Sequence, residues 1–343
     1  MLAQAAEAEA RFDVDALVAH LSAAVRELTA AGANRGAAMA CVRLGQAYGD
    51  ALGNQTASRA WFVRARRLLE DEPPCLEQGW VAVAAMGCAV DDPSALLAAA
   101  ELALDRARRF GDVNLETKAL ADAGLAHVQA GRVARGMSLL DEAMALACGP
   151  ADDESTAAKS VCSFFTACYQ AADYARATSW TDPLRRRGLL GAAGPGPLFL
   201  SSHCDSVQGA LLIELGRWTE ADAVLTRAIE AFEAATSMPA WHPAIVLADL
   251  RVRQGRVGEA EQLLLGKDQA MEALVPAARA HLAAGDPAMA RAVAQRGLRV
   301  LGADVLRAVG LRAVAAEAMT ALGDLDAAEQ VARELAELAS HVT

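Results

Sequence analysis

The chain has 343 residues, of which 54% are hydrophobic and 4% aromatic, and its formal net charge is −11. One compact core stops growing at about 250–300 residues, so this length favours a repeat array whose units bury their apolar faces against their neighbours. The acidic charge and the lack of a dense Lys/Arg patch argue against autonomous DNA binding.

The N-terminus and the hydropathy pattern argue against export and membrane insertion. Residues 1–13 hold no basic segment followed by an apolar core, so they do not form a signal peptide. No uncharged run of about 20 apolar residues occurs, and we therefore expect a cytoplasmic protein. Seven cysteines include no CxxC pair, which argues against a zinc ribbon, and we expect each to pack as a small buried side chain.

The first third predicts helices of irregular length. Alanine-rich sequence with few aromatics favours helix over sheet. We expect an amphipathic helix over 11–32, a helix pair over 39–73 that turns near 53–56, and a helix pair over 80–112 that turns at 91–93.

A short turn motif recurs in the rest of the chain. A small residue, usually Gly, follows an apolar helix, a polar residue comes next, and another small residue stands five places after the first. Gly suits the left-handed conformation at a helix C-terminus, and the second small residue lets two helices cross closely. The copies are GRVARG at 131–136, ADYARA at 172–177, GRWTEA at 216–221, GRVGEA at 255–260, GDPAMA at 285–290 and GDLDAA at 323–328.

The spacing of these turns predicts the fold class. The starts lie 30 to 44 residues apart, against about 34 for a tetratricopeptide unit. We expect an all-α, tetratricopeptide-like superhelix of stacked antiparallel helix pairs. Three loops, at 148–155, 188–197 and 236–243, interrupt one continuous domain over 1–343, with irregular repeats in 1–120 and clearer ones in 121–343.

With the repeats in place, the chain resembles the tetratricopeptide sensor region of actinobacterial LuxR-type transcriptional regulators. The similarity runs over most of 40–340, and the resemblance implies a sensing or docking role in transcription regulation. The stretches that carry it are ASRAWFVRARRLLEDEPPCLEQGWVAV, AHVQAGRVARGMSLLDEAMA, ADYARATSW and GALLIELGRWTEADAVLTRAIEAFE.

The chain departs from that group in two respects. It has neither a DNA-reading helix-turn-helix nor a GxxxxGK[ST] phosphate loop. It is therefore expected to be an excised sensor region or a stand-alone relative. In the group, the segment before 211–215 tends to hold Cys with Arg and His; Cys204 fits that place, but DSVQGA replaces the basic residues.

The middle of the chain gathers the candidate ligand-binding residues. Aromatics are rare elsewhere, and stacked helices bring equivalent positions together, which suggests a pocket with some polar groups. Ordinary packing explains the same residues, and Cys162 and Cys168 lie about 240° apart on a helix, which argues against a shared metal. The candidates are Phe165, Tyr169, His203, Cys204, Trp241 and His242.

Three function classes remain. The first is a binding or sensor module for a small molecule or a peptide in the concave groove, with a possible protein partner or homodimer. The second is a protein–protein scaffold, and the third is an enzyme or a metal/thiol-dependent ligand-binding protein of secondary metabolism. We expect no cofactor, no metal, no direct nucleic acid binding and no membrane contact. An enzyme is less expected, because no GxSxG or HExxH motif occurs.

Overall fold

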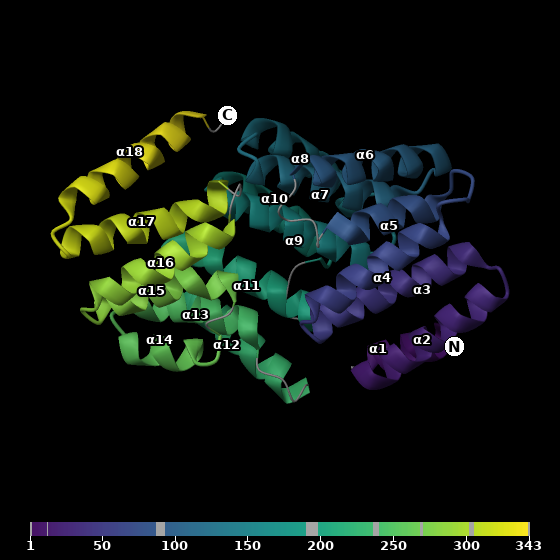
Figure 1. Ribbon diagram of the computed structural model, residues 1–343, viewed down its shortest axis with the longest axis horizontal. Helices are drawn as coiled ribbons and strands as arrows, with labels where there is room; N and C mark the ends of the chain where they lie inside the picture. Colours follow the sequence, from purple (N-terminus) through teal and green to yellow (C-terminus); the bar gives the residue numbers. More distant parts are fainter. Residues whose placement is uncertain are drawn as a thin grey trace. The chain divides into compact units, whose positions relative to one another are not determined.

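The computed structural model describes residues 2–11, 13–86, 93–189, 198–235, 240–267, 270–301 and 305–341. Every regular element among these residues is helical, in agreement with the predicted class (Figure 1). The α-helices are α1 (Leu2–Ala10), α2 (Val14–Ala30), α3 (Asn34–Gln46), α4 (Gln55–Leu68), α5 (Leu76–Met86), α6 (Pro93–Phe110), α7 (Val113–Gln129), α8 (Val133–Cys148), α9 (Glu154–Gln170), α10 (Tyr174–Arg186), α11 (Leu198–Glu214), α12 (Trp218–Ala235), α13 (Trp241–Arg253), α14 (Val257–Leu264), α15 (Leu274–Ala283), α16 (Pro287–Leu301), α17 (Val305–Ala321) and α18 (Leu325–His341). A π-helical turn (Ala47–Ala51) follows α3, and a 3₁₀ turn (Met271–Ala273) precedes α15.

The recurring motif forms the predicted turn between paired helices. All five predicted Gly positions have a positive φ, for example +72° at Gly216. Ala172 adopts the same conformation at φ 54° although it carries a Cβ, which costs about 1–2 kcal/mol. Gly32, Gly53 and Gly111 have equivalent angles, so the same turn chemistry extends into the first third.

The small residue after each turn is buried, as the motif predicts. Ala221, Ala260 and Ala290 are fully buried at helix crossings. Gly209 has a similar role on α11, because an added Cβ would overlap the side chain of Leu225 on α12. These contacts explain why small side chains recur at this point in the repeat.

The described chain divides into two compact units. Unit 1 comprises Met1–Ala126, Ser138–Ser163 and Pro183–Phe199. Unit 2 comprises His127–Met137, Phe164–Asp182 and Leu200–Thr343. The expectation of one continuous repeat domain over 1–343 stays a prediction.

Unit 1 builds its first core from α1 to α5. Asn54 caps the start of α4 by accepting a hydrogen bond from the backbone N–H of Ala57 at 3.0 Å. The buried side of α4 places Phe62 against Gly45 of α3, within a cluster that includes Leu21 and Leu44. This packing fixes which face of α4 remains at the surface.

Unit 2 stacks its helix pairs in chain order from α12 to α18 (Figure 1). The first helices of successive pairs touch one another, since α13 contacts α15 and α15 contacts α17. Among the described residues, the second helices α14, α16 and α18 make no comparably extensive contacts with one another. The first helices therefore lie on the inner side of the stack, and we call α9, α11, α13, α15 and α17 the A helices.

One predicted loop is shorter than expected. Helix α13 begins at Trp241, so the last part of the 236–243 segment is helical. Pro243 lies in the first turn, where a missing backbone N–H removes no helical hydrogen bond. The residues 236–239 and 190–197 of the predicted loops lie outside the described residues.

Candidate functional site

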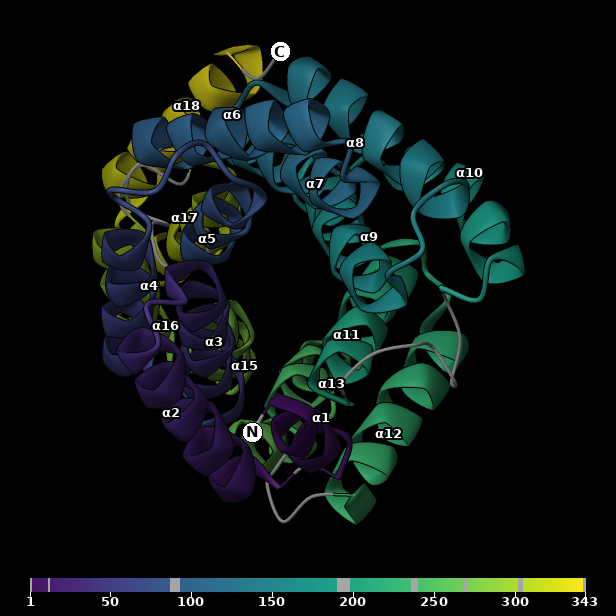
Figure 2. The ribbon, with the colours of Figure 1, turned by 90° about the vertical axis from the view of Figure 1, so that its right-hand side faces the viewer.

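The A helices of unit 2 carry a connected row of charged side chains near their C-terminal ends. Figure 2 shows α11, α13 and α15 side by side, with α12 on their outer side. Arg253 of α13 forms ion pairs with Glu214 of α11 and, at 2.8 Å, with Asp249 of its own helix. Arg279 of α15 donates to the other carboxylate oxygen of Asp249 at 2.7 Å. Three successive A helices are thus linked by one network.

The carboxylate at the centre of this network is buried and fully paired. Asp249 is only 9% exposed, and it accepts hydrogen bonds from both arginines through its two oxygens. A buried carboxylate is tolerated only when it is paired in this way. Arg279 keeps about a third of its side-chain surface exposed, so its guanidinium borders the surface of the A-helix face.

Tyr169 of α9 extends the row to a fourth A helix. Burial of its hydroxyl end raises the pKa of Tyr169 to about 12, and the negative charges of Asp249 and Glu214 act in the same direction. The positive charges of Arg253 and Arg279 oppose them. The side chain as a whole is 38% exposed, so a protonated hydroxyl borders the charged network beside an accessible ring.

The predicted site residues divide between this row and its surroundings. Tyr169 belongs to the row, and His242 is exposed on the same face of α13, because seven residues separate it from Asp249 and return the helix to almost the same direction. Cys204 of α11 is half-buried and disulfide-bonded, so it offers no free thiol. The side chain of His203 lies outside the described residues.

The other two predicted residues lie apart from the row. Phe165 is buried, and its ring contacts Phe164, which in turn meets Trp180 edge-on at 6.5 Å between ring centroids. Trp241 is 43% exposed, but it points about 80° away from Asp249 around α13. Phe165 therefore has a packing role here, and Trp241 borders a different face.

Sequence reasoning missed the four charged members of the row. A signal for them exists in the register of the repeats: Glu214 and Arg253 each stand two residues before the Gly of the turn, and Asp249 and Arg279 each stand six residues before it. Glu214 and Arg253 have a further feature in common. Each also follows a partly exposed valine by seven residues, Val207 in α11 and Val246 in α13. Seven residues are almost two helical turns, so each valine lies on the same face as its charged residue.

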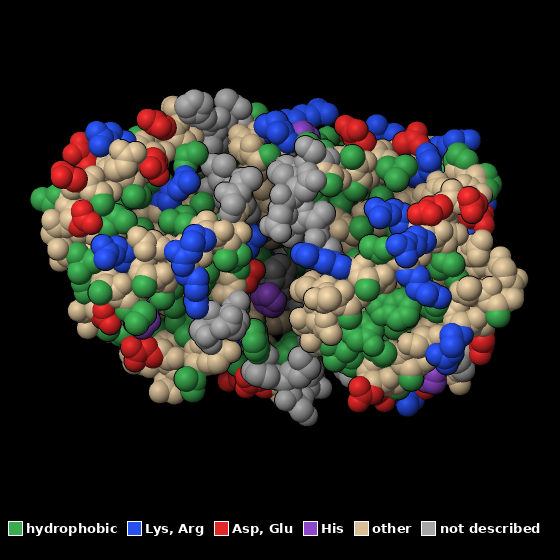
Figure 3. Space-filling model, viewed as in Figure 1, with side chains coloured by type: hydrophobic (Ala, Val, Ile, Leu, Met, Phe, Trp, Pro, Cys, Tyr) green, Lys and Arg blue, Asp and Glu red, His purple; other side chains and the backbone are tan. Residues whose placement is uncertain are grey.

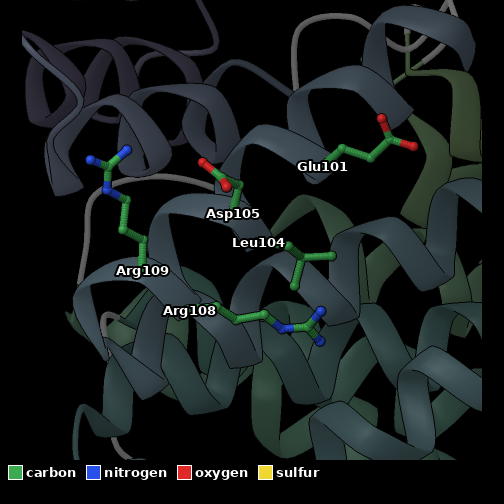
Figure 4. Close-up of a pocket in the computed structure, with 5 residues that line it drawn as sticks. All are labelled: Glu101, Leu104, Asp105, Arg108 and Arg109. Atoms are coloured by element: carbon green, nitrogen blue, oxygen red, sulfur yellow. The ribbon is translucent and has the colours of Figure 1, made fainter.

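A surface pocket lies elsewhere, on α6 of unit 1 (Figure 4). Its lining residues all belong to this one helix, so no opposing wall encloses a ligand. Arg108, at its edge, is already paired with Glu116 at 2.8 Å. The lining residues are Glu101, Leu104, Asp105, Arg108 and Arg109.

Neither a cluster of metal-binding side chains nor a membrane-spanning helix occurs in the described part of the chain. Within it, no group of three or more His, Cys, Asp or Glu side chains is arranged to hold a metal ion. None of its helices combines the length and the apolar character that crossing a membrane requires.

The comparisons with known proteins concern the fold. No family model and no curated protein matches the sequence. A crystal structure of a Rap protein complexed with competence and sporulation factor is similar, with a TM-score of 0.67 and 11% sequence identity. The match covers 99% of this chain and 97% of that chain. The chain therefore has a tetratricopeptide-like helical-repeat fold, as the spacing of its turns predicts.

Proposed function

We propose that the chain is a binding module that holds a peptide across the A-helix face of unit 2. The observation that carries this proposal is the charged row, in which Tyr169, Glu214, Arg253 and Arg279 come from four successive A helices. A ligand that meets all four helices has to be extended, and a peptide offers amides and side chains along such a length.

The chemistry of the face favours a peptide over a compact apolar ligand. Pockets for small molecules are mostly apolar and enclose the ligand, whereas this row is polar and borders the surface. The half-exposed Val207 and Val246 stand almost two turns before the charged row and add apolar contacts beside it. A Rap protein of the same fold crystallised with competence and sporulation factor is consistent with such a use.

The proposal includes a regulatory role. The resemblance to the sensor region of LuxR-type regulators suggests that ligand binding changes how the chain meets a protein partner or a second copy. We place this action in the cytoplasm. A binding face on stacked helices fits this regulatory role, because repeat arrays present extended concave surfaces whose curvature can change when a ligand binds.

Native mass spectrometry of protein purified from its own source tests the proposal. We expect an additional mass that fragments as a peptide in the wild type and is absent from Arg279→Glu. The matched control is Arg299→Glu, which makes the same charge change at an exposed position of α16.

Two outcomes would contradict the proposal. One is a co-purifying compound that is not a peptide, or a peptide that Arg279→Glu retains as well as the wild type does. The other is a ligand-free mass combined with no thermal shift across a peptide library.

A further inference from the structure

The second helix of the pair α3–α4 is basic in an acidic chain. Residues 34–69 contain six arginines and one acidic residue, whereas the whole chain has a net charge of −11. Helix α4 itself carries four arginines and neither Asp nor Glu. Figure 3, drawn in the view of Figure 1, shows basic side chains beside exposed hydrophobic ones over the region of α3 to α5.

The side chains of three of the four arginines of α4 have no partner among the described residues, whereas Arg64 interacts with Cys41 of α3. Arg59, Arg66 and Arg67 are exposed, and none forms an ion pair within the described ranges. By contrast, the exposed Arg217 and Arg256 each pair with a glutamate three residues later on the helix. Glu70 stands three residues after Arg67, but it lies beyond the end of α4 and forms no ion pair with that arginine in the described part of the chain.

The exposed face has an apolar centre. Arg59, Val63 and Arg66 follow a four- and three-residue spacing along one stripe, and Arg67 flanks it one turn from Val63. Val63 is 39% exposed between these guanidinium groups. The side of α4 next to this stripe is held in the core by Phe62 and Ala65, and the stripe itself remains at the surface.

Helix-end electrostatics explain only part of this pattern. Arg66 and Arg67 lie in the last turn of α4, where a positive charge is favoured by the helix dipole. Arg59 lies about two turns earlier, beyond the reach of that effect. The end of a helix also does not explain why the stretch from Gln55 to Leu69 contains neither Asp nor Glu.

We propose that this face of α4 is a docking surface for an acidic helix of a partner protein. Carboxylates spaced one to two turns apart on such a helix match Arg59, Arg66 and Arg67, and a small apolar residue between them covers Val63. A protein fits better than a nucleic acid, because the apolar centre and the overall charge of −11 both disfavour a phosphate backbone. The proposal goes beyond the peptide-binding function of unit 2 and does not depend on it.

A charge-reversal experiment tests the surface. The probe is a synthetic amphipathic helix with glutamate at i, i+4 and i+7 and leucine between, and binding is followed by fluorescence anisotropy at low and physiological salt. We expect Arg59→Glu, Arg66→Glu and Arg67→Glu together to weaken binding about tenfold or more, since three charge pairs become repulsive.

The matched control is Arg291→Glu, Arg296→Glu and Arg299→Glu on α16. This helix also carries three arginines and no acidic residue, but Arg291 faces Asp324 at 3.7 Å. The control changes the net charge by the same amount, and we expect binding within about twofold of wild type. Circular dichroism establishes that both variants are folded.

Four outcomes would overturn the proposal. They are no binding of the acidic helix, equal losses in both triple variants, tighter binding of duplex DNA than of the acidic helix, and self-association of the wild type that the α4 variant abolishes. The last would assign the surface to a second copy of this chain.

Discussion

The arginines of α13 and two exposed arginines of α4 differ in whether a carboxylate pairs with them. On α13, Arg251 is 7% exposed and bonded to Asp222, and Arg253 bridges two carboxylates. On α4, Arg59 and Arg66 are exposed, with no carboxylate partner in the described part of the chain. An arginine that is paired within the fold holds neighbouring side chains in a fixed arrangement. An exposed arginine without a partner can instead pair with a carboxylate of another protein.

This difference separates two kinds of recognition. The A-helix row has as many acidic as basic side chains in its network, so a ligand there meets a fixed pattern of donors and acceptors rather than a field of one sign. The α4 face presents one sign of charge, which affects the rate and salt dependence of association most strongly. The following predictions test each side of the comparison.

The largest effect is expected from Asp249→Ala. It leaves Arg279 without its partner and removes one of the two carboxylates that Arg253 bridges, in a position only 9% exposed. We expect the free energy of unfolding to fall by about 2–4 kcal/mol, measured by urea denaturation. Glu230→Ala, at an exposed position of α12, should change it by less than about 0.5 kcal/mol. Equal losses in the two variants would show that the network does not stabilise the fold.

A smaller effect is expected from Arg253→Lys. The single ammonium group of lysine cannot reproduce the fork through which Arg253 binds Glu214 and Asp249. We expect a loss of about 1–2 kcal/mol in the same denaturation experiment. Arg279→Lys, which replaces one hydrogen bond rather than several, should cost about half as much. The reverse order would mean that the bridge to α11 contributes little.

Alkaline titration tests the burial of the Tyr169 hydroxyl. Its folded-state pKa of about 12 lies above the ordinary value of 10, so the folded state retains the proton longer than the unfolded state does. The corresponding stability is complete below pH 10 and is lost as the pH rises toward 12. Burial also raises the pKa of Tyr174, so Tyr169→Phe should remove the titration of one tyrosine near pH 12 from the tyrosinate absorbance and leave that of Tyr174 in place. An unchanged titration in that variant would contradict the burial.

The smallest effect on stability is expected on α4. Because Arg59 and Arg66 form no ion pairs among the described residues, Arg59→Ala and Arg66→Ala should each change the free energy of unfolding by less than about 0.5 kcal/mol. The check is urea denaturation beside Arg253→Ala, which should be clearly destabilising. A large loss in the α4 variants would reveal a structural role for these charges and remove the contrast with α13.

The fold could be predicted from the sequence because turn chemistry is local. Gly216 and its equivalents mark helix ends through a backbone conformation that other residues adopt at a cost. Ala172 was recognised from its motif alone, although alanine is an unusual residue at a positive φ. The sequence predicts too much loop at 236–243, because a proline ends a helix unless it lies in the first turn, as Pro243 does.

The candidate site was harder to predict because it depends on contacts between repeats. Tyr169 was found through the rarity of aromatics, but Glu214 and Arg279 resemble ordinary surface charges in the sequence. Their pairing with Arg253 and Asp249 joins residues 30 to 39 positions apart. Only alignment of successive A helices by their turns brings such residues into register. In that alignment Glu214 and Arg253 share the position two residues before the turn Gly, and Asp249 and Arg279 share the position six residues before it.

The seven-residue spacing that places Val246 and Arg253 on one face of α13 also governs which evolutionary changes the site tolerates. Insertion of one residue between them would turn Arg253 by about 100° and break its bridge between Glu214 and Asp249. Gain or loss of a whole helix pair would leave the register of the other pairs intact. Homologues of this chain should therefore differ in the number of repeats more readily than in the length of any A helix.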